Sequence, residues 1–228
     1  QLLEGVEDLE AVVSRRTTQA RGLLRVSAPT SFGRRRLAPL LQPFLAAQPR
    51  LTLELNLSDA FVDLMAEDVD VAVRIGGYEA DNPLMHRLAP NRRVLCASPA
   101  YLAEHGAPDS LDDLRRHAQL AAENQSTWRL EGPEGPVVFR ARSRVRTNSS
   151  EVARELALAG GGVALRSTWD VGDELRDGRL KVVLPQYAGS SDVAIFALTA
   201  GRARAETRVR AFIDFLSGLY GETPEWDR

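Results

Sequence analysis

The chain has 228 residues, of which 44% are hydrophobic, so it can bury the core of one large domain or of two small lobes. A formal net charge of −2 excludes the overall basic field of a protein that grips nucleic acid across its surface. No apolar run is long enough to cross a bilayer, and the single cysteine excludes a disulfide framework within the chain. These features predict a reducing, cytoplasmic location without membrane contact, and burial of Cys96 within the apolar run VLCAS.

Residues 1–21 are predicted to form one amphipathic, acidic helix. Leu2, Val6, Leu9 and Val13 are spaced four, three and four residues apart, as in the seam of a coiled coil. Two heptads fit a dimerising coiled coil and a helix packed on its own domain equally well. The acidic composition is unlike a signal peptide, and the absent initial Met indicates the end of a longer linker helix.

The next segment has the pattern of a parallel β-α-β unit. Apolar strands are expected at 23–28, 51–57 and 69–75, with a helix after the first strand and a short helix at 61–66. Pro39 suits a first helical turn, whereas Pro43 is expected to kink or delay the helix. Hydroxyl groups follow the first strand directly, where a helix N-terminus favours a small anion.

Shorter elements are predicted further along the chain. Strands are expected at 85–89, 92–98, 120–123, 128–130, 137–139, 144–148, 163–167 and 193–199. Helices are expected after Pro99, after the N-cap candidate Ser110, after Ser149 and Ser150, at 168–178 and at 207–219. This alternation predicts an α/β protein.

No pattern indicates a catalytic, metal or cofactor site. Gly160 to Gly162 lack the Lys and Ser/Thr of a phosphate-binding loop, and their position favours a helix C-cap. His86, His105 and His117 are too far apart in sequence for a metal-ligand motif. We therefore expect no metal, no cofactor and no enzymatic activity.

Seven stretches, in order and covering nearly the whole chain from Leu23, resemble the effector-binding part of the LysR-type transcriptional regulators. They include LLRVSAPTSFG, DVDVAVRIG, RVRTNSSEVARELALAGGGVALRS and VRAFIDFL. The stretch RLAPNRRVLCASPAYLAEHG is similar to the CrgA-like subgroup of that family.

The resemblance implies a two-lobed fold like a type 2 periplasmic binding protein, each lobe a mixed sheet flanked by helices. It places the end of a linker and dimerisation helix at 1–21, lobe I at 22–97 and 198–228, and lobe II at 98–197. A small, acidic effector is expected between the lobes of a homodimer or homotetramer. DNA would be bound only through a helix-turn-helix module that these 228 residues do not include.

The family's effector positions can be carried over one at a time. In lobe I they correspond to Thr30, Ser31, Phe32, Arg74 and Gly76; in lobe II they correspond to Asn124, Thr147, Asn148, Ser149 and Ser167. Hydroxyls and backbone N–H groups at these turns suit a carboxylate, although plain N-capping uses the same groups. Arg74 suits a rim salt bridge as well as an acidic ligand, and Phe32 suits the core as well as an apolar contact.

Two other classes of protein fit the sequence less well. A periplasmic-type solute-binding protein for a transporter would share the fold, but it should carry a secretory signal and no amphipathic helix before its first strand. An enzyme would need a convergent acid, base or nucleophile, and no such set is evident.

Overall fold

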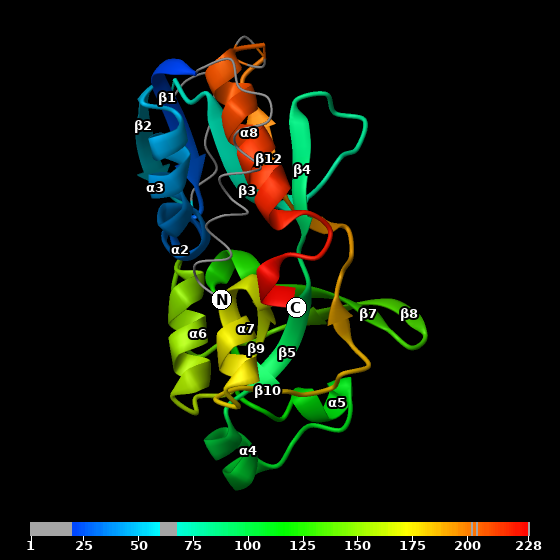
Figure 1. Ribbon diagram of the computed structural model, residues 1–228. Helices are drawn as coiled ribbons and strands as arrows, with labels where there is room; N and C mark the ends of the chain where they lie inside the picture. The colour runs from blue at the N-terminus through cyan, green and yellow to red at the C-terminus, as the bar shows by residue number, and fades with distance from the viewer. Residues whose placement is uncertain (1–19, 60–67, 202, 204, 228) are drawn as a thin grey trace. The chain divides into compact units, whose positions relative to one another are not determined.

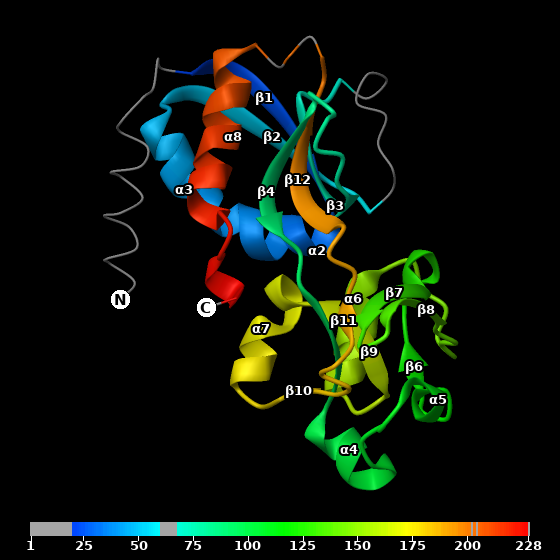
Figure 2. The same cartoon turned by 90° about the vertical axis from the view of Figure 1, so that its right-hand side faces the viewer.

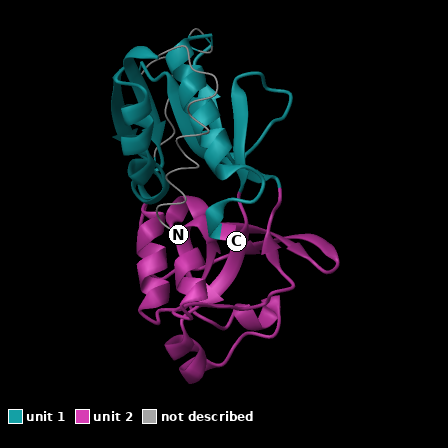
Figure 3. Ribbon diagram, in the orientation of Figure 1, with its two compact units in different colours: residues 1–90, 192–226, 228 teal, residues 91–191, 227 magenta. Residues whose placement is uncertain are grey.

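The computed structural model describes residues 20–59, 68–201, 203 and 205–227. The chain divides into two compact units: residues 1–90 with 192–226 and 228, and residues 91–191 with 227 (Figure 3). The helices expected at 1–21 and 61–66 lie outside the described residues, except that Ala20 and Arg21 lead into the first strand.

Unit 1 is built on a five-stranded sheet with the order β2-β1-β3-β12-β4 among the described residues (Figure 1). Its strands are β1 Arg21–Ala28, β2 Arg50–Leu57, β3 Val71–Gly77, β4 Met85–Pro90 and β12 Val193–Thr199. Strand β1 runs parallel to both β2 and β3, whereas β12 is antiparallel to β3 and β4. The predicted β-α-β pattern is confirmed, and the carboxyl ends of β1, β2 and β3 therefore share one sheet edge.

One continuous helical segment, residues 30–47, follows β1. It consists of α2 Thr30–Phe32, the π-helical turn Gly33–Leu37 and α3 Ala38–Ala47. The N–H of Ala38 bonds to the carbonyl of Gly33, five residues back. Pro43 is predicted to kink or delay the helix, but α3 continues through it to Ala47. The wide turn comes just before Pro39, which has no N–H to donate.

Two long helices pack together in unit 1. Helix α8, Thr207–Tyr220, meets α3 where the ring of Phe44 lies 5.3 Å from Phe212 and 5.0 Å from Phe215. Figures 1 and 2 show both helices running beside the first sheet. The predicted amphipathic character of residues 207–219 is confirmed, since Val209, Phe212 and Leu216 are buried. A short 3-10 turn, Glu225–Asp227, follows α8.

Unit 2 contains a second, seven-stranded sheet with the order β6-β9-β5-β11-β7-β8, and β10 pairs with β5. The strands are β5 Arg93–Ala97, β6 Gln119–Leu120, β7 Thr127–Gly132, β8 Gly135–Arg140, β9 Val163–Ser167, β10 Lys181–Val182 and β11 Ala188–Gly189. Strand β5 thus joins the second sheet and β12 the first. The lobe boundaries predicted from the sequence had placed residues 93–97 in lobe I and 193–197 in lobe II.

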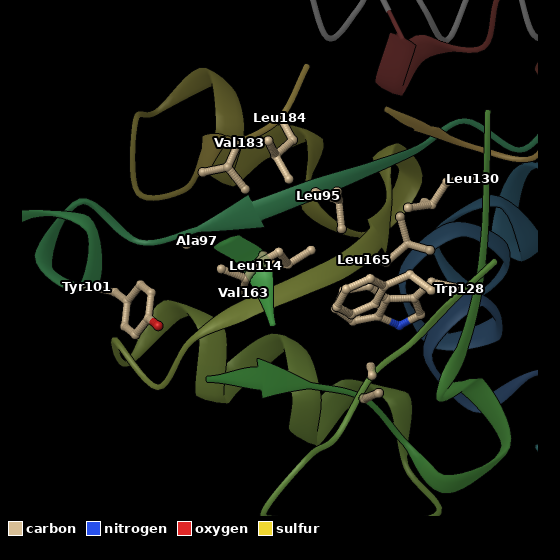
Figure 4. Packing of buried hydrophobic residues seen from close by; sticks show 13 residues of the cluster. Leu95, Ala97, Tyr101, Leu114, Trp128, Leu130, Val163, Leu165, Val183 and Leu184 are labelled. Carbon is tan, nitrogen blue, oxygen red and sulfur yellow. The ribbon is translucent and has the colours of Figure 1, made fainter. Parts of the chain in front are cut away.

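Strand alternation in β5 and β9 gives unit 2 two apolar faces. Cys96 and Ala164 pack towards α6 Ser150–Leu158 and α7 Thr168–Arg176. The opposite face, which includes Leu95 and Leu165, forms the cluster shown in Figure 4. There the Trp128 ring stacks on Phe139 at 5.4 Å. The remaining helices of this unit are α4 Pro99–His105, α5 Leu111–Leu114 and the 3-10 turn Glu123–Gln125.

The prediction of a strand at 144–148 is wrong. Residues 141–149 form no strand, because local bonds replace a ladder: the Ser143 hydroxyl donates to the Val145 carbonyl and accepts from the Val145 N–H. No helix of the described residues is long and apolar enough to span a membrane. The α/β class with two mixed sheets flanked by helices is confirmed.

Candidate functional site

The candidate residues of unit 1 gather at the carboxyl edge of the first sheet. Thr30 and Ser31 come directly after β1. Ser27 pairs with Ala72, so Arg74 and Gly76, two and four residues further along β3, reach the same edge. In open α/β sheets ligands bind outside the carboxyl ends of strands.

The turn after β1 is already partly occupied by a carboxylate of the chain. Asp59 Oδ1 accepts the Thr30 N–H at 2.9 Å, and Pro29 at the N-cap position contributes no side-chain bond. Ser31 is buried and Phe32 is completely buried, so the Phe32 ring belongs to the core. The amides and hydroxyls of Thr30 and Ser31 are the groups of this turn that suit an anion.

Arg74 is the cation of this edge. Its guanidinium donates to the Val73 carbonyl at 2.7 Å and to the buried Ser27 hydroxyl at 3.0 Å. These bonds orient a half-buried positive charge near the carboxyl end of β1. By contrast, a Cβ at Gly76 would meet no atom within 4 Å, so packing does not require glycine there.

The candidate residues of unit 2 share an edge of the second sheet for the same reason. Strands β6 and β9 are parallel, with Leu120 opposite Ala164; Asn124 follows the carboxyl end of β6, and Ser167 is the last residue of β9. The Glu123 N–H donates to the Thr147 carbonyl at 2.9 Å, which joins the loop before α6 to this edge. The Thr147 hydroxyl accepts the Ser149 N–H at 3.1 Å and orders the turn that also contains exposed Asn148.

Serine residues at helix starts in unit 2 behave in two ways. Ser98 caps α4 by accepting the Tyr101 N–H at 3.3 Å, and Ser110 caps α5 by accepting the Asp113 N–H at 3.1 Å. Ser149 and Ser167 occupy the N-cap positions of α6 and α7 but make no side-chain cap bond. The capping expected of Ser149 is therefore absent. The two nine-residue helices have no side-chain cap at their N-termini, although the Thr168 N–H of α7 donates to the Arg92 carbonyl at 2.9 Å.

A buried network of charges lies behind these two helix starts. Arg154 of α6 bonds to the Asp170 carbonyl at 3.3 Å and pairs with Glu174 of α7. Arg166 of β9 donates from Nε to Asp170 Oδ2 at 2.9 Å. All four side chains are at most 7% exposed. The network fixes α6, β9 and α7 relative to one another, and sequence reasoning missed it because it joins residues up to 20 positions apart.

Other chemical groups of unit 2 lie away from this edge. A hollow of about 420 Å³ near α4 and α5 is lined by none of the predicted residues; its walls are Tyr101, His105, Asp113, Arg116, His117 and Ala118. Desolvation raises the pKa of the Cys96 thiol to about 12, so it is not a nucleophile at neutral pH. Across the part of the chain that the structure describes, no three His, Cys, Asp or Glu side chains converge as metal ligands.

Comparison with protein families decides the class. The family model described as the LysR substrate binding domain matches residues 17–219. The chain belongs to this family. Among curated relatives, the HTH-type transcriptional regulator DmlR of Escherichia coli is 36% identical over 205 residues, covering 88% of this chain and 66% of DmlR. The E. coli activator TtdR is 31% identical over 204 residues, covering 88% of this chain and 65% of TtdR. The chain thus spans just under two thirds of these relatives.

Solved LysR-family structures share the fold. The Vibrio cholerae virulence activator AphB superposes with a TM-score of 0.76 at 28% identity, covering 95% of this chain and 75% of AphB. The CrgA regulatory domain of Neisseria meningitidis gives a TM-score of 0.74 at 28% identity, covering 86% of this chain and 98% of that domain. The expected resemblance to LysR-type regulators and their CrgA-like members is confirmed. The transporter alternative gains no support, since these relatives are regulators.

Proposed function

We propose that this LysR-family domain senses a small acidic effector through the hydroxyl-bearing turns at the carboxyl edges of its sheets. The observation that carries the proposal is that Ser149 and Ser167 occupy N-cap positions without capping. An uncapped helix N-terminus presents N–H donors and a partial positive charge, which suit a carboxylate. The cationic Arg74, at the edge that also holds Thr30, supports the same class of ligand.

The remaining candidates complete the proposal. Ser31 and Thr147 would supply hydroxyls, and Asn124 and Asn148 are exposed amides that can donate to an acid or accept from a hydroxyl. Gly76 leaves space at its edge. Asp59 competes at Thr30, so an acid that reaches that amide has to displace this carboxylate.

Signalling to DNA would follow from a population shift. An effector that binds one conformation more tightly raises the share of that conformation, and the same free energy changes how the protein presents its DNA-binding part. The relatives carry HTH-type names, which supports DNA contact through a helix-turn-helix module beyond these 228 residues. We propose a cytoplasmic homodimer or homotetramer without enzymatic activity.

The test is calorimetry of the 228-residue chain with four probes: acetate, succinate, citrate and benzoate. We expect at least one acid to bind, and the double variant Ser31→Ala, Thr147→Ala to lose most of that affinity. The single variants separate the contribution of each unit. Ser110→Ala is the matched control, because this serine caps α5 and should leave binding unchanged. Unchanged affinity in the double variant would contradict the assignment.

A further inference from the structure

The carboxyl-terminal end of unit 1 holds the helical turn that follows the candidate effector residues. The Tyr220 hydroxyl donates to the Arg36 carbonyl at 2.8 Å, across 184 residues of sequence. The Tyr220 ring also lies 6.0 Å from the Phe32 ring, edge-on at 69°. One side chain at the end of α8 therefore touches both Phe32 and the π-helical turn.

Trp226 makes a second set of contacts to the same helical segment. Its ring lies edge-on to Phe32 at 6.4 Å and 5.1 Å from Tyr220, and the Arg36 guanidinium sits 5.3 Å from the Trp226 centroid. The three aromatic rings are at most 5% exposed, so these contacts are desolvated and strong for their type. The Trp226 Nε1 has no hydrogen-bond partner among the described residues, so its hold is through ring packing and the cation–π contact.

The segment that is held has an unusual winding. Residues 33–37 form a π-helical turn. This geometry is rare in proteins overall, but where it occurs it is often at a functional site. Pro39 has no N–H and so cannot donate a backbone hydrogen bond to this turn. Contacts from outside the helix therefore contribute more to the position of the turn. On the other side of Phe32, Asp59 bonds to the Thr30 N–H.

We propose that Tyr220 and Trp226 are positioning residues for the effector turn: by holding Phe32 and Arg36 they set the place of Thr30 and Ser31. This inference rests on the proposed function for the role of Ser31. It gives the carboxyl-terminal segment a role in ligand sensing. The sequence does not reveal this role, because the segment lies far along the chain from residues 30–36.

Hydrogen exchange of the ligand-free 228-residue chain, followed by mass spectrometry, tests the positioning. Tyr220→Phe removes the hydroxyl and keeps the ring; we expect peptides covering residues 29–37 to exchange about tenfold faster, since one net hydrogen bond is lost. Trp226→Leu should give a similar local effect, and Trp226→Phe, which keeps an aromatic ring, a smaller one. Peptides from β12 and from unit 2 should exchange at the wild-type rate.

Tyr78→Phe is the matched control, because Tyr78 is a half-buried tyrosine of the same unit that makes a ring contact with Phe196. Exchange at residues 29–37 that is equal in Tyr220→Phe and Tyr78→Phe would overturn the inference. Faster exchange across all of unit 1 would also overturn it, by showing a general packing role.

The same variants are then titrated with whichever of acetate, succinate, citrate or benzoate binds the wild-type chain. Tyr220→Phe should weaken binding about threefold to tenfold by loosening the turn. If no acid binds the wild type, the proposed ligand class fails, while the exchange experiment still decides whether Tyr220 and Trp226 fix the turn. If an acid binds and Tyr220→Phe matches the wild-type affinity, the link to sensing fails.

Discussion

At the scale of single residues, the N-cap positions of unit 2 separate serines with a structural role from serines available to a ligand. Ser98 and Ser110 each accept a backbone N–H, whereas Ser149 and Ser167 do not. All four follow the same sequence rule, in which serine precedes a helix. The turn before α6 is ordered instead by the Ser149 N–H, which donates to the Thr147 hydroxyl.

Alanine at these positions should therefore have unequal effects on stability. Ser110→Ala removes a cap bond and should lower the free energy of unfolding by about 1 kcal/mol. Ser149→Ala removes no cap bond and should change it by less than about 0.5 kcal/mol. Urea unfolding followed by circular dichroism measures both values. An equal loss in the two variants would show that Ser149 caps α6 after all.

Cys96 gives a prediction on reactivity and pH. Because burial raises its pKa to about 12, the native thiol stays protonated, and a thiol reagent at pH 8 should label the protein only after urea is added. Below pH 9.0 the thiol is protonated in both the folded and the unfolded chain. As pH rises from 9.0 towards 12 only the unfolded chain ionises, so the free energy of unfolding falls. A Cys96→Ala variant should lose less stability over that range. Rapid native labelling at pH 8 would contradict the burial argument.

At the scale of elements, charge as well as apolar packing joins the helices of unit 2 to their sheet. Apolar residues of α6 and α7 cover Cys96 and Ala164, while Arg154 and Arg166 join the same elements through Asp170 and Glu174. Buried ion pairs contribute little net stability compared with apolar residues, but removing one partner leaves an uncompensated charge. The pairing therefore fixes geometry, which matters here because both helix starts belong to the candidate site.

Arg154→Met should destabilise the protein by about 3 kcal/mol, because Glu174 would remain buried with less compensation. Arg176→Met is the matched control, since Arg176 makes an exposed pair with Asp173 and should cost less than about 1 kcal/mol. Chemical denaturation compares the two variants. A loss no larger for Arg154→Met than for Arg176→Met would show that the network adds nothing to the fold.

The turn between α6 and β9 requires glycine at position 162. The φ of +147° at Gly162 disfavours other residues, and a Cβ would stand 2.4 Å from the Ala118 carbonyl oxygen. Gly162→Ala should lower the free energy of unfolding by about 2 kcal/mol or more. The contrasting substitution is Gly76→Ala, whose Cβ meets no atom within 4 Å and should leave the melting temperature almost unchanged. Similar melting temperatures for the two variants would contradict this account.

At the scale of the whole molecule, two sheets each present a carboxyl edge with hydroxyl-bearing turns. Parallel pairing brings this about in both units: β1 with β2 and β3 in unit 1, and β6 with β9 in unit 2. A ligand that binds only the native protein raises its stability by mass action. The molecule as a whole should therefore report effector binding as thermal stabilisation.

An acid that binds should stabilise the chain by about 2.7 kcal/mol at one hundred times its dissociation constant. Differential scanning fluorimetry over a concentration series measures the rise in melting temperature. Sodium chloride at equal ionic strength is the control for general salt effects. Ser31→Ala, Thr147→Ala should lose the shift, and a shift of wild-type size in that variant would place binding elsewhere.

Much of the fold followed from local patterns. The β-α-β alternation, Gly at the helix ends and the amphipathic face of α8 predicted the α/β class and most elements. The strand expected at 144–148 failed because Ser143 bonds to its own neighbour Val145, a competition that apolar periodicity does not record. The continuation of α3 through Pro43 could not be foreseen either, since a proline inside a helix removes an N–H donor and locally favours a break.

The candidate site likewise combines features that the local sequence sets with features that only tertiary contacts set. The sequence by itself determined the α/β class and the residue types at each turn, because local hydrogen bonding and apolar periodicity are properties of short segments. The family followed from the resemblance of the ordered stretches from Leu23 onward. Only the tertiary structure decided which serines cap, which carboxylate occupies the Thr30 amide, and that Tyr220 and Trp226 hold Phe32 and Arg36. The Tyr220–Arg36 bond joins residues 184 positions apart, and such long-range pairing is set by packing of the whole unit rather than by any local pattern.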